Sequence, residues 1–83
     1  MATAISSHAL IGRCYRISAT TTHPIASNHI GALAQITTVW RLVDGACGFS
    51  VELYSGTTKA IELSGLLSHE LINPQGVPVR ATF

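Results

Sequence analysis

The carboxylates Glu52 and Glu62 come closest, in this 83-residue chain, to a spacing that could perform acid–base chemistry. Both occupy outward positions of neighbouring predicted strands, so they could face each other across one sheet. Two carboxylates in such a pair can act as general acid and general base. Carboxylates on a sheet face are more commonly solvated or paired with cations, here Arg16 or Arg41. We expect that second role and assign no catalytic residue.

Cysteine and histidine offer two other kinds of chemistry. Cys14 would be an activated nucleophile if His69 lay beside it, but we expect it to be a small buried thiol. Cys14 and Cys47 are too few for a disulfide framework or a zinc site. We expect both to be reduced, with one disulfide as the alternative. His23 and His29 share a loop without a neighbouring carboxylate or thiol, so we expect no metal site there.

Three aromatic residues could line a binding groove. Tyr15, Trp40 and Tyr54 come from separate predicted strands, and aromatic grooves on small β-barrels bind extended peptides. For Trp40 we favour a core or subunit-interface position. The sequence has no nucleophile elbow, no glycine-rich phosphate loop and no paired-histidine motif of metal hydrolases. Whether the protein is an enzyme is left open, and a binding or structural role is favoured.

The elements that must position these residues are strands. An apolar–polar period of two recurs in four segments, which is typical of half-buried strands. In the first strand Arg13, Tyr15 and Ile17 are expected on one face, and Cys14, Arg16 and Ser18 on the other. In the second, Ala34, Ile36, Thr38, Trp40 and Leu42 are expected on one face; in the third, Phe49, Val51 and Leu53 point inward. The four segments are 13–18, 34–43, 49–54 and 59–63.

Turns and loops divide these strands. Asp44-Gly45 and Ser55-Gly56 are tight-turn signals, and residues 19–31, which contain Pro24, form a long loop. Residues 64–71 suit a single 3₁₀ turn, and residues 71–73 a short closing strand. No helical period occurs. The sequence therefore predicts an all-β protein, a small SH3-like five-stranded barrel with one 3₁₀ turn. It is one domain, residues 1–83, with core 12–73 and terminal arms 1–8 and 74–83.

Composition predicts association. Hydrophobic residues make up 47% of the chain and charged residues 11%, with a formal net charge of +1. The usual charged fraction is roughly 25%, and a surface poor in charge is weakly protected against self-association. We expect a homo-oligomer rather than a monomer covered by Ser and Thr. The expected interface comprises Trp40 and Val39 with Val79 and Phe83, the apolar tail docking on a neighbouring subunit.

Charge and hydropathy also exclude partner classes. The five Lys and Arg residues are too scattered for the basic stripe of a nucleic-acid binder. No segment approaches the length of a membrane span, and the N-terminal residues lack the pattern of a signal peptide. We expect a cytoplasmic protein whose partners are copies of itself, another protein or a small molecule.

A set of short motifs between residues 35 and 73 resembles those of a known family, and the first strand, residues 13–18, is similar in character. The motifs are Gln35-Ile36, Trp40, Gly48-Phe49-Ser50-Val51-Glu52, Gly56, Ile61 to Leu63 and Glu70 to Asn73. In these the chain resembles the plasmid-borne type B, trimethoprim-resistant dihydrofolate reductases. The resemblance implies SH3-like barrels in a homotetramer around one pore, where NADPH reduces dihydrofolate. A Val-Gln-Ile-Tyr strand and a lysine line that pore.

At the pore motif this chain departs from the family. It has Ile61-Glu62-Leu63-Ser64 in place of Val-Gln-Ile-Tyr, and Arg16 near the place of the lysine. Symmetry-related carboxylates would repel the anionic groups of NADPH and folate. The catalytic residues are therefore not transferred, and no cofactor is expected outside this alternative.

Three functions follow from these observations. We favour a small self-associating module with a binding or structural role, whose expected binding residues are Arg16, Tyr15, Trp40, Glu62 and Tyr54. The alternative is an oligomeric pore enzyme related to the reductases, with altered ligand specificity and NADPH as cofactor. A nucleic-acid-binding barrel is the second alternative.

Overall fold

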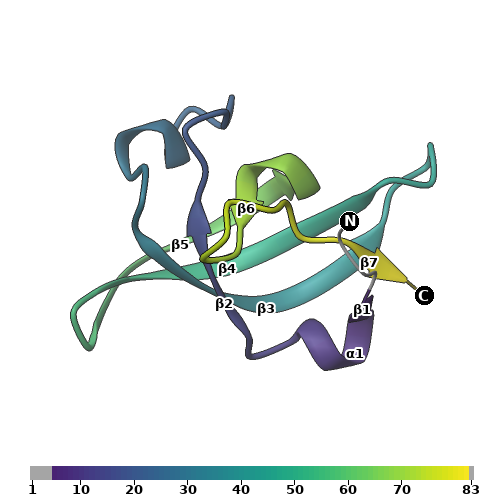
Figure 1. Cartoon of the computed structure of the whole chain (residues 1–83), viewed down its shortest axis with the longest axis horizontal. Coiled ribbons are helices and arrows are strands. Elements are labelled where there is room, and N and C mark those ends of the chain that lie inside the picture. Colours follow the sequence, from purple (N-terminus) through teal and green to yellow (C-terminus); the bar gives the residue numbers. More distant parts are fainter. Residues whose placement is uncertain (1–4, 83) are drawn as a thin grey trace.

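Antiparallel strands dominate the computed structural model, which describes residues 5–82. Within this range five strands form one sheet in the order β5-β4-β3-β2-β6, and β1 and β7 pair in parallel (Figure 1). The sheet is not closed into a barrel, because β5 and β6 remain its two edges. The strands are β1 (Ile5–Ser6), β2 (Cys14–Ile17), β3 (Leu33–Arg41), β4 (Cys47–Ser55), β5 (Thr58–Leu67), β6 (Leu71–Ile72) and β7 (Ala81–Thr82).

The core follows the expected alternation along β2 and β4. Tyr15 and Ile17 are buried on β2, and Phe49, Val51 and Leu53 on β4. The intervening residues are exposed or half-buried, as the period of two requires. Leu10, Ala26, Ala34, Ile36, Leu63, Leu66, Leu71 and Val79 complete the core.

A β-bulge in β3 overturns the predicted faces of that strand. Ile36 pairs with Val51, but the next pair is Thr38 with Ser50, so Thr37 is an extra residue. A bulge of this kind reverses the side-chain parity beyond it. Val39 consequently packs against the core. Trp40, expected on the face of Ile36, points to the opposite side.

Short helical segments modify the all-β prediction. Helix α1 (Ser7–Leu10) places Leu10 in the core, although the sequence showed no helical period. The long loop contains the 3₁₀ turn η1 (Ala26–Asn28), and the predicted 3₁₀ turn is limited to η2 (Ser68–Glu70). Strand β5 continues to Leu67, past the predicted start of that turn.

The C-terminal tail docks on its own domain, which corrects the expectation that it docks on a neighbour. Val79 is 3% exposed, and its backbone N–H donates to the oxygen of Leu71 at 2.9 Å. Pro78 forms a bridge with Ile72, and β7 pairs with β1. Val79 is thus a core residue, not a free interface residue. Phe83 lies outside the described residues.

None of the helices between residues 5 and 82 has the length and apolar character needed to cross a bilayer.

Candidate functional site

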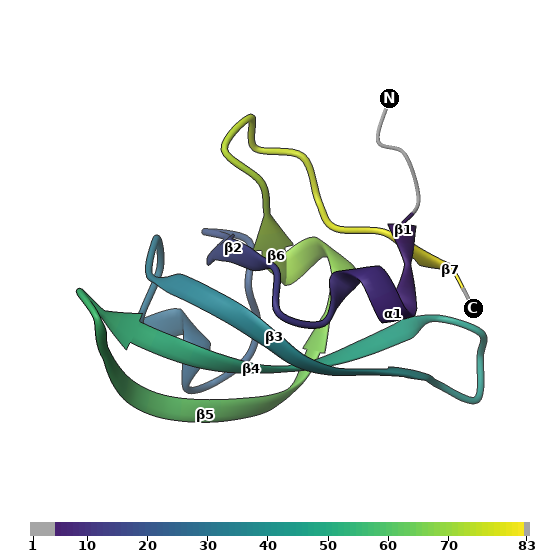
Figure 2. The same cartoon turned by 90° about the horizontal axis from the view of Figure 1, so that it is seen from below.

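One side of the three long strands forms a broad surface directed away from the core. Helix α1, η2 and β6 all lie on the same side of the ribbon made by β3, β4 and β5 (Figure 2). We call the opposite side the outer face. Strand register places the half-buried side chains of Gln35, Ser50, Glu52 and Tyr54 on it.

The apolar end of the outer face is built on Trp40. Register aligns Trp40 with Gly48 on β4, and Gly48 with Leu67 on β5. A Cβ atom at Gly48 would lie 2.5 Å from the indole nitrogen of Trp40. Only glycine therefore allows the ring to lie so close to the strand. Trp40 and Leu67 are half-buried, so this end presents apolar surface.

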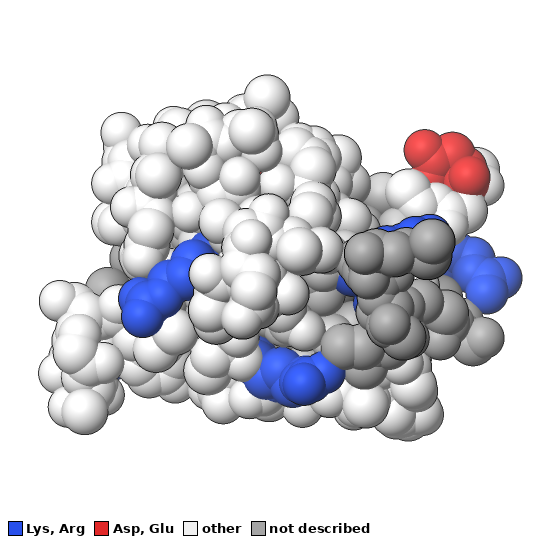
Figure 3. Space-filling model, in the orientation of Figure 1, with Lys and Arg blue, Asp and Glu red and all other residues white. Residues whose placement is uncertain are grey.

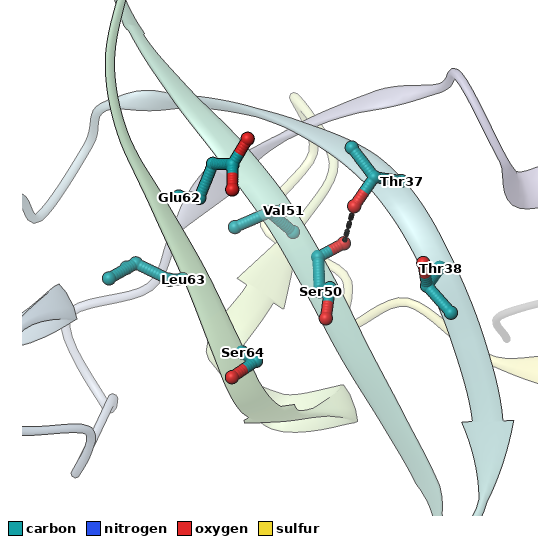
Figure 4. A pocket seen from close by; sticks show the side chains of 7 residues that line it. All are labelled: Thr37, Thr38, Ser50, Val51, Glu62, Leu63 and Ser64. Atoms are coloured by element: carbon teal, nitrogen blue, oxygen red, sulfur yellow. Dashed lines mark hydrogen bonds between the residues drawn. The ribbon is translucent and has the colours of Figure 1, made fainter.

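A pocket of about 400 Å³ opens in the middle of the outer face. Its side chains come from three adjacent strands (Figure 4). The hydroxyl of Thr37 donates to the backbone oxygen of Ser50 at 3.2 Å across this region. The lining residues are Thr37, Thr38, Ser50, Val51, Glu62, Leu63 and Ser64.

Irregular strand pairing accounts for the position of the pocket. The β3–β4 register shifts between Ile36 and Thr38, and the β4–β5 register shifts between Phe49 and Val51. Gly65 lies in that second irregularity with φ of +79°, a conformation that disfavours other residues. Bulges bend strands and interrupt the ladder. Because these two irregularities lie next to each other on adjacent strand pairs, they leave a hollow in the sheet.

A lysine joins the two carboxylates beside the pocket. Glu52 and Glu62 are register partners, as the sequence indicated. Lys59 Nζ lies 3.2 Å from Glu52 Oε2 and 2.8 Å from Glu62 Oε1. Lys59 is therefore a cation between them, where Arg16 or Arg41 had been expected. We call Glu52, Lys59 and Glu62 the charged cluster.

Contacts within the charged cluster shift the pKa values of its members. The hydrogen bond from Lys59, followed by its charge, holds the pKa of Glu62 below its ordinary value. The same contacts raise the pKa of Lys59. The Tyr54 hydroxyl lies 3.3 Å from Glu52 Oε1 and from Gln35 Oε1. Partial desolvation, then the charge of Glu52, raises the pKa of Tyr54.

The pKa shift of Glu62 is opposite in direction to the one that a general acid requires. A general acid needs a carboxyl pKa raised toward neutral pH, whereas that of Glu62 is lowered. Hydroxyl groups and one carboxylate edge suit a polar ligand that donates hydrogen bonds. Across residues 5–82 no three His, Cys, Asp or Glu side chains are grouped so as to hold a metal ion.

The outer face unites four of the five predicted binding residues and excludes the fifth. Glu62 lies on β5 and Tyr54 on β4. Arg16 on β2 pairs with Leu33 on β3, and Leu33 in turn pairs with Tyr54. Trp40 lies at the opposite end of the same face. Tyr15 is 8% exposed in the core, so the predicted aromatic groove of Tyr15, Trp40 and Tyr54 is wrong.

The two cysteines are free thiols in different places. Cys14 is exposed, which corrects the expected buried thiol, and register pairs it with Gln35. Cys47 is half-buried, and its Sγ lies 3.7 Å from the backbone oxygen of Ala81.

Sequence reasoning missed how residues 19–31 are anchored. Glu70 is 2% exposed, and its carboxylate accepts from the Thr21 hydroxyl and from the backbone N–H groups of His23 and Leu67. Arg16 donates to the oxygen of Gly31 at 3.3 Å. Glu70 stood out only as part of the Glu70 to Asn73 motif, and nothing in that motif indicated a loop partner.

Charge is sparse on the side that carries β6 and the tail. Figure 3 shows several basic groups and an acidic group at the β3–β4 hairpin. Asp44 lies in the turn of that hairpin, and its Oδ1 accepts from the backbone N–H of Ala46. The described residues visible on this side form no continuous basic stripe of the kind that tracks phosphates.

Comparisons with protein-family models, with curated proteins and with solved structures found no match for this chain.

Proposed function

We propose that this protein is a small SH3-like module that associates with copies of itself through the outer face and binds a partner or ligand there. The observation that carries the proposal is the half-buried Trp40, whose indole lies over Gly48 at the end of a broad sheet face. Large aromatic side chains are enriched in interface cores.

Charge balance on the outer face supports a second copy as the occupant. Lys59 neutralises part of the charge of Glu52 and Glu62. The pocket end, with Thr37, Thr38 and Ser50, has hydroxyl groups. Two such faces would meet with little electrostatic repulsion, in keeping with the 11% charged composition.

We also propose that the fold is of the SH3-like class. The strand order β5-β4-β3-β2-β6, with a 3₁₀ turn before the last sheet strand, matches the connectivity of SH3-like barrels. We assign the domain to that class on connectivity, although the edges are not hydrogen-bonded.

Sedimentation velocity of the full chain tests self-association. We expect an oligomer at micromolar concentration, and a monomer for Thr38→Lys, which places a charge on the outer face. Gln75→Lys makes the same charge change at an exposed turn of the tail and should sediment like the parent. A monomeric parent chain, or equal dissociation by both variants, would contradict the proposal.

A pore enzyme related to the reductases is the second candidate. It is favoured by the pocket, because Glu62, Leu63 and Ser64 line it, and these belong to the segment that the resemblance assigns to a pore. Ligands that bind the native state raise Tm. This candidate predicts a higher Tm with NADPH or a pteridine, and a larger rise in Glu62→Gln. Absence of any rise in both proteins would remove it.

A further inference from the structure

The ring of His23 connects the long loop to strand β5. Its Nε2 lies 2.8 Å from the backbone oxygen of Ser64, and its Nδ1 lies 3.2 Å from the backbone nitrogens of Ile25 and Ala26. A carbonyl oxygen only accepts and an amide N–H only donates. The ring is therefore the neutral tautomer with its proton on Nε2.

This ring also caps a helical turn. Pro24 follows His23, and the backbone N–H of Ser27 donates to the oxygen of His23 at 3.0 Å. The first N–H groups of a helical turn have no partner within it. Nδ1 of His23 supplies that partner, in the manner of an N-cap side chain.

We propose that His23 is a proton-sensitive latch between the loop of residues 19–31 and the pocket. A second proton on Nδ1 would turn an acceptor into a donor directed at two donors. The imidazolium would have to leave this position, and the turn would lose its cap. The backbone oxygen of Ser64, a residue that lines the pocket, would lose its hydrogen bond to the His23 ring. Acidification therefore releases the loop at the edge of the pocket.

Other charged and titratable residues belong to the loop or to segments that are hydrogen-bonded to it. The carboxylate of Glu70 attracts an imidazolium, but it is bonded to the backbone N–H of His23 and to Thr21. The oxygen of His69 accepts from Thr20, and the backbone N–H of His29 donates to Ala26. At the far end of the loop, Arg16 holds Gly31.

These neighbours limit what opens. Gly31 also donates its backbone N–H to the oxygen of Ile17 at 2.8 Å, so the loop's end at β3 stays attached when the ring leaves. Opening is expected at residues 23–28, the segment that the ring caps.

Nuclear magnetic resonance of the full chain tests the latch. The ring nitrogens of His23 should report the Nε2–H tautomer at neutral pH. As the ring titrates, protection of the Ile25 and Ala26 amides from hydrogen exchange, corrected for intrinsic rates, should fall by about tenfold or more. A ring protonated on Nδ1 at neutral pH would overturn the proposal without any variant.

Three substitutions separate His23 from its neighbours. His23→Asn offers an amide oxygen as cap but does not titrate, so its amides should keep their protection as pH falls. His29→Asn and His69→Asn remove the other nearby imidazoles and should respond like the parent. The same pH-dependent loss of protection in His23→Asn would assign the opening to Glu70 or to another group and refute the latch.

Discussion

At the scale of single residues, Glu70 determines how the loop and the 3₁₀ turn are joined. A buried carboxylate is costly unless donors surround it. Here a hydroxyl and two backbone N–H groups donate to its oxygens. Its own backbone oxygen accepts from Ser18 at 2.9 Å. One residue thus links β2, the loop and the end of β5.

Replacing this carboxylate by an amide should destabilise the fold. Glu70→Gln removes one acceptor oxygen and places an NH₂ group beside donors, which should lower the free energy of unfolding by about 2–4 kcal/mol. Urea unfolding followed by circular dichroism measures the loss. Glu62→Gln makes the same chemical change at an exposed site and should leave the midpoint nearly unchanged. Equal effects of the two variants would contradict the role of Glu70.

The charged cluster predicts a titration shift. Lys59 lowers the pKa of Glu62, so their interaction stabilises the fold at neutral pH and is lost as pH falls through that lowered pKa. In Lys59→Gln the pKa of Glu62 should rise toward its ordinary value, as measured by carboxyl ¹³C titration. Added salt should raise the pKa of Glu62 in the parent protein, but it should have little effect in Lys59→Gln. An unchanged pKa in Lys59→Gln would show that the contact is not formed in solution.

At the scale of elements, the tail completes the core. Val79 fills a buried position beside β6, and β7 pairs in parallel with the N-terminal strand β1. The two ends of the described chain lie near each other (Figure 1). Residues after β6 are therefore part of the folded unit rather than a free arm.

A matched pair of valine substitutions measures this contribution. Val79→Ala leaves a cavity in the core and should lower the free energy of unfolding by about 1–3 kcal/mol. Val43→Ala deletes the same atoms at the fully exposed β3–β4 turn and should have no measurable effect. Thermal unfolding of both variants gives the comparison. If Val79→Ala were as stable as the parent, the tail would not be docked in solution.

Local alternation was sufficient to predict that β2 and β4 are strands, the buried face of β4 and the turns of the hairpins. Phe49, Val51 and Leu53 are buried as expected, whereas on β2 the alternation did not decide which face is buried, and Cys14, expected to be buried, is on the exposed one. Periodicity has no means of locating a bulge, since an extra residue depends on the partner strand. The reversal of Val39 and Trp40, and with it the pocket, was unpredictable for that reason.

Long-range anchoring was equally hidden from the sequence. His23 lies 41 residues from Ser64, and Thr21 lies 49 residues from Glu70. Their pairing depends on where the loop folds back over the end of β5. From the sequence, His23 and His29 were considered only as metal ligands of a long loop. The hydrogen bonds of the His23 ring to Ser64, Ile25 and Ala26 were not predicted.

At the scale of the whole molecule, the fold has a covered side and an outer face. Helix α1, η2, β6 and the tail cover the core on one side of the long strands (Figure 2). The outer face combines an apolar end at Trp40, a polar pocket and a charged cluster. The composition of 47% hydrophobic and 11% charged residues is the reason why we propose that association covers the outer face.

Emission from Trp40, the single tryptophan of the chain, measured on serial dilution from high micromolar concentration, tests this account most directly. Self-association through the outer face predicts blue-shifted emission in the concentrated sample and a red shift as dilution exposes the indole. The same shift should be absent in Thr38→Lys, which should emit like the diluted parent at every concentration. Parent emission that stays constant across the dilution series would contradict the outer face as the surface of association.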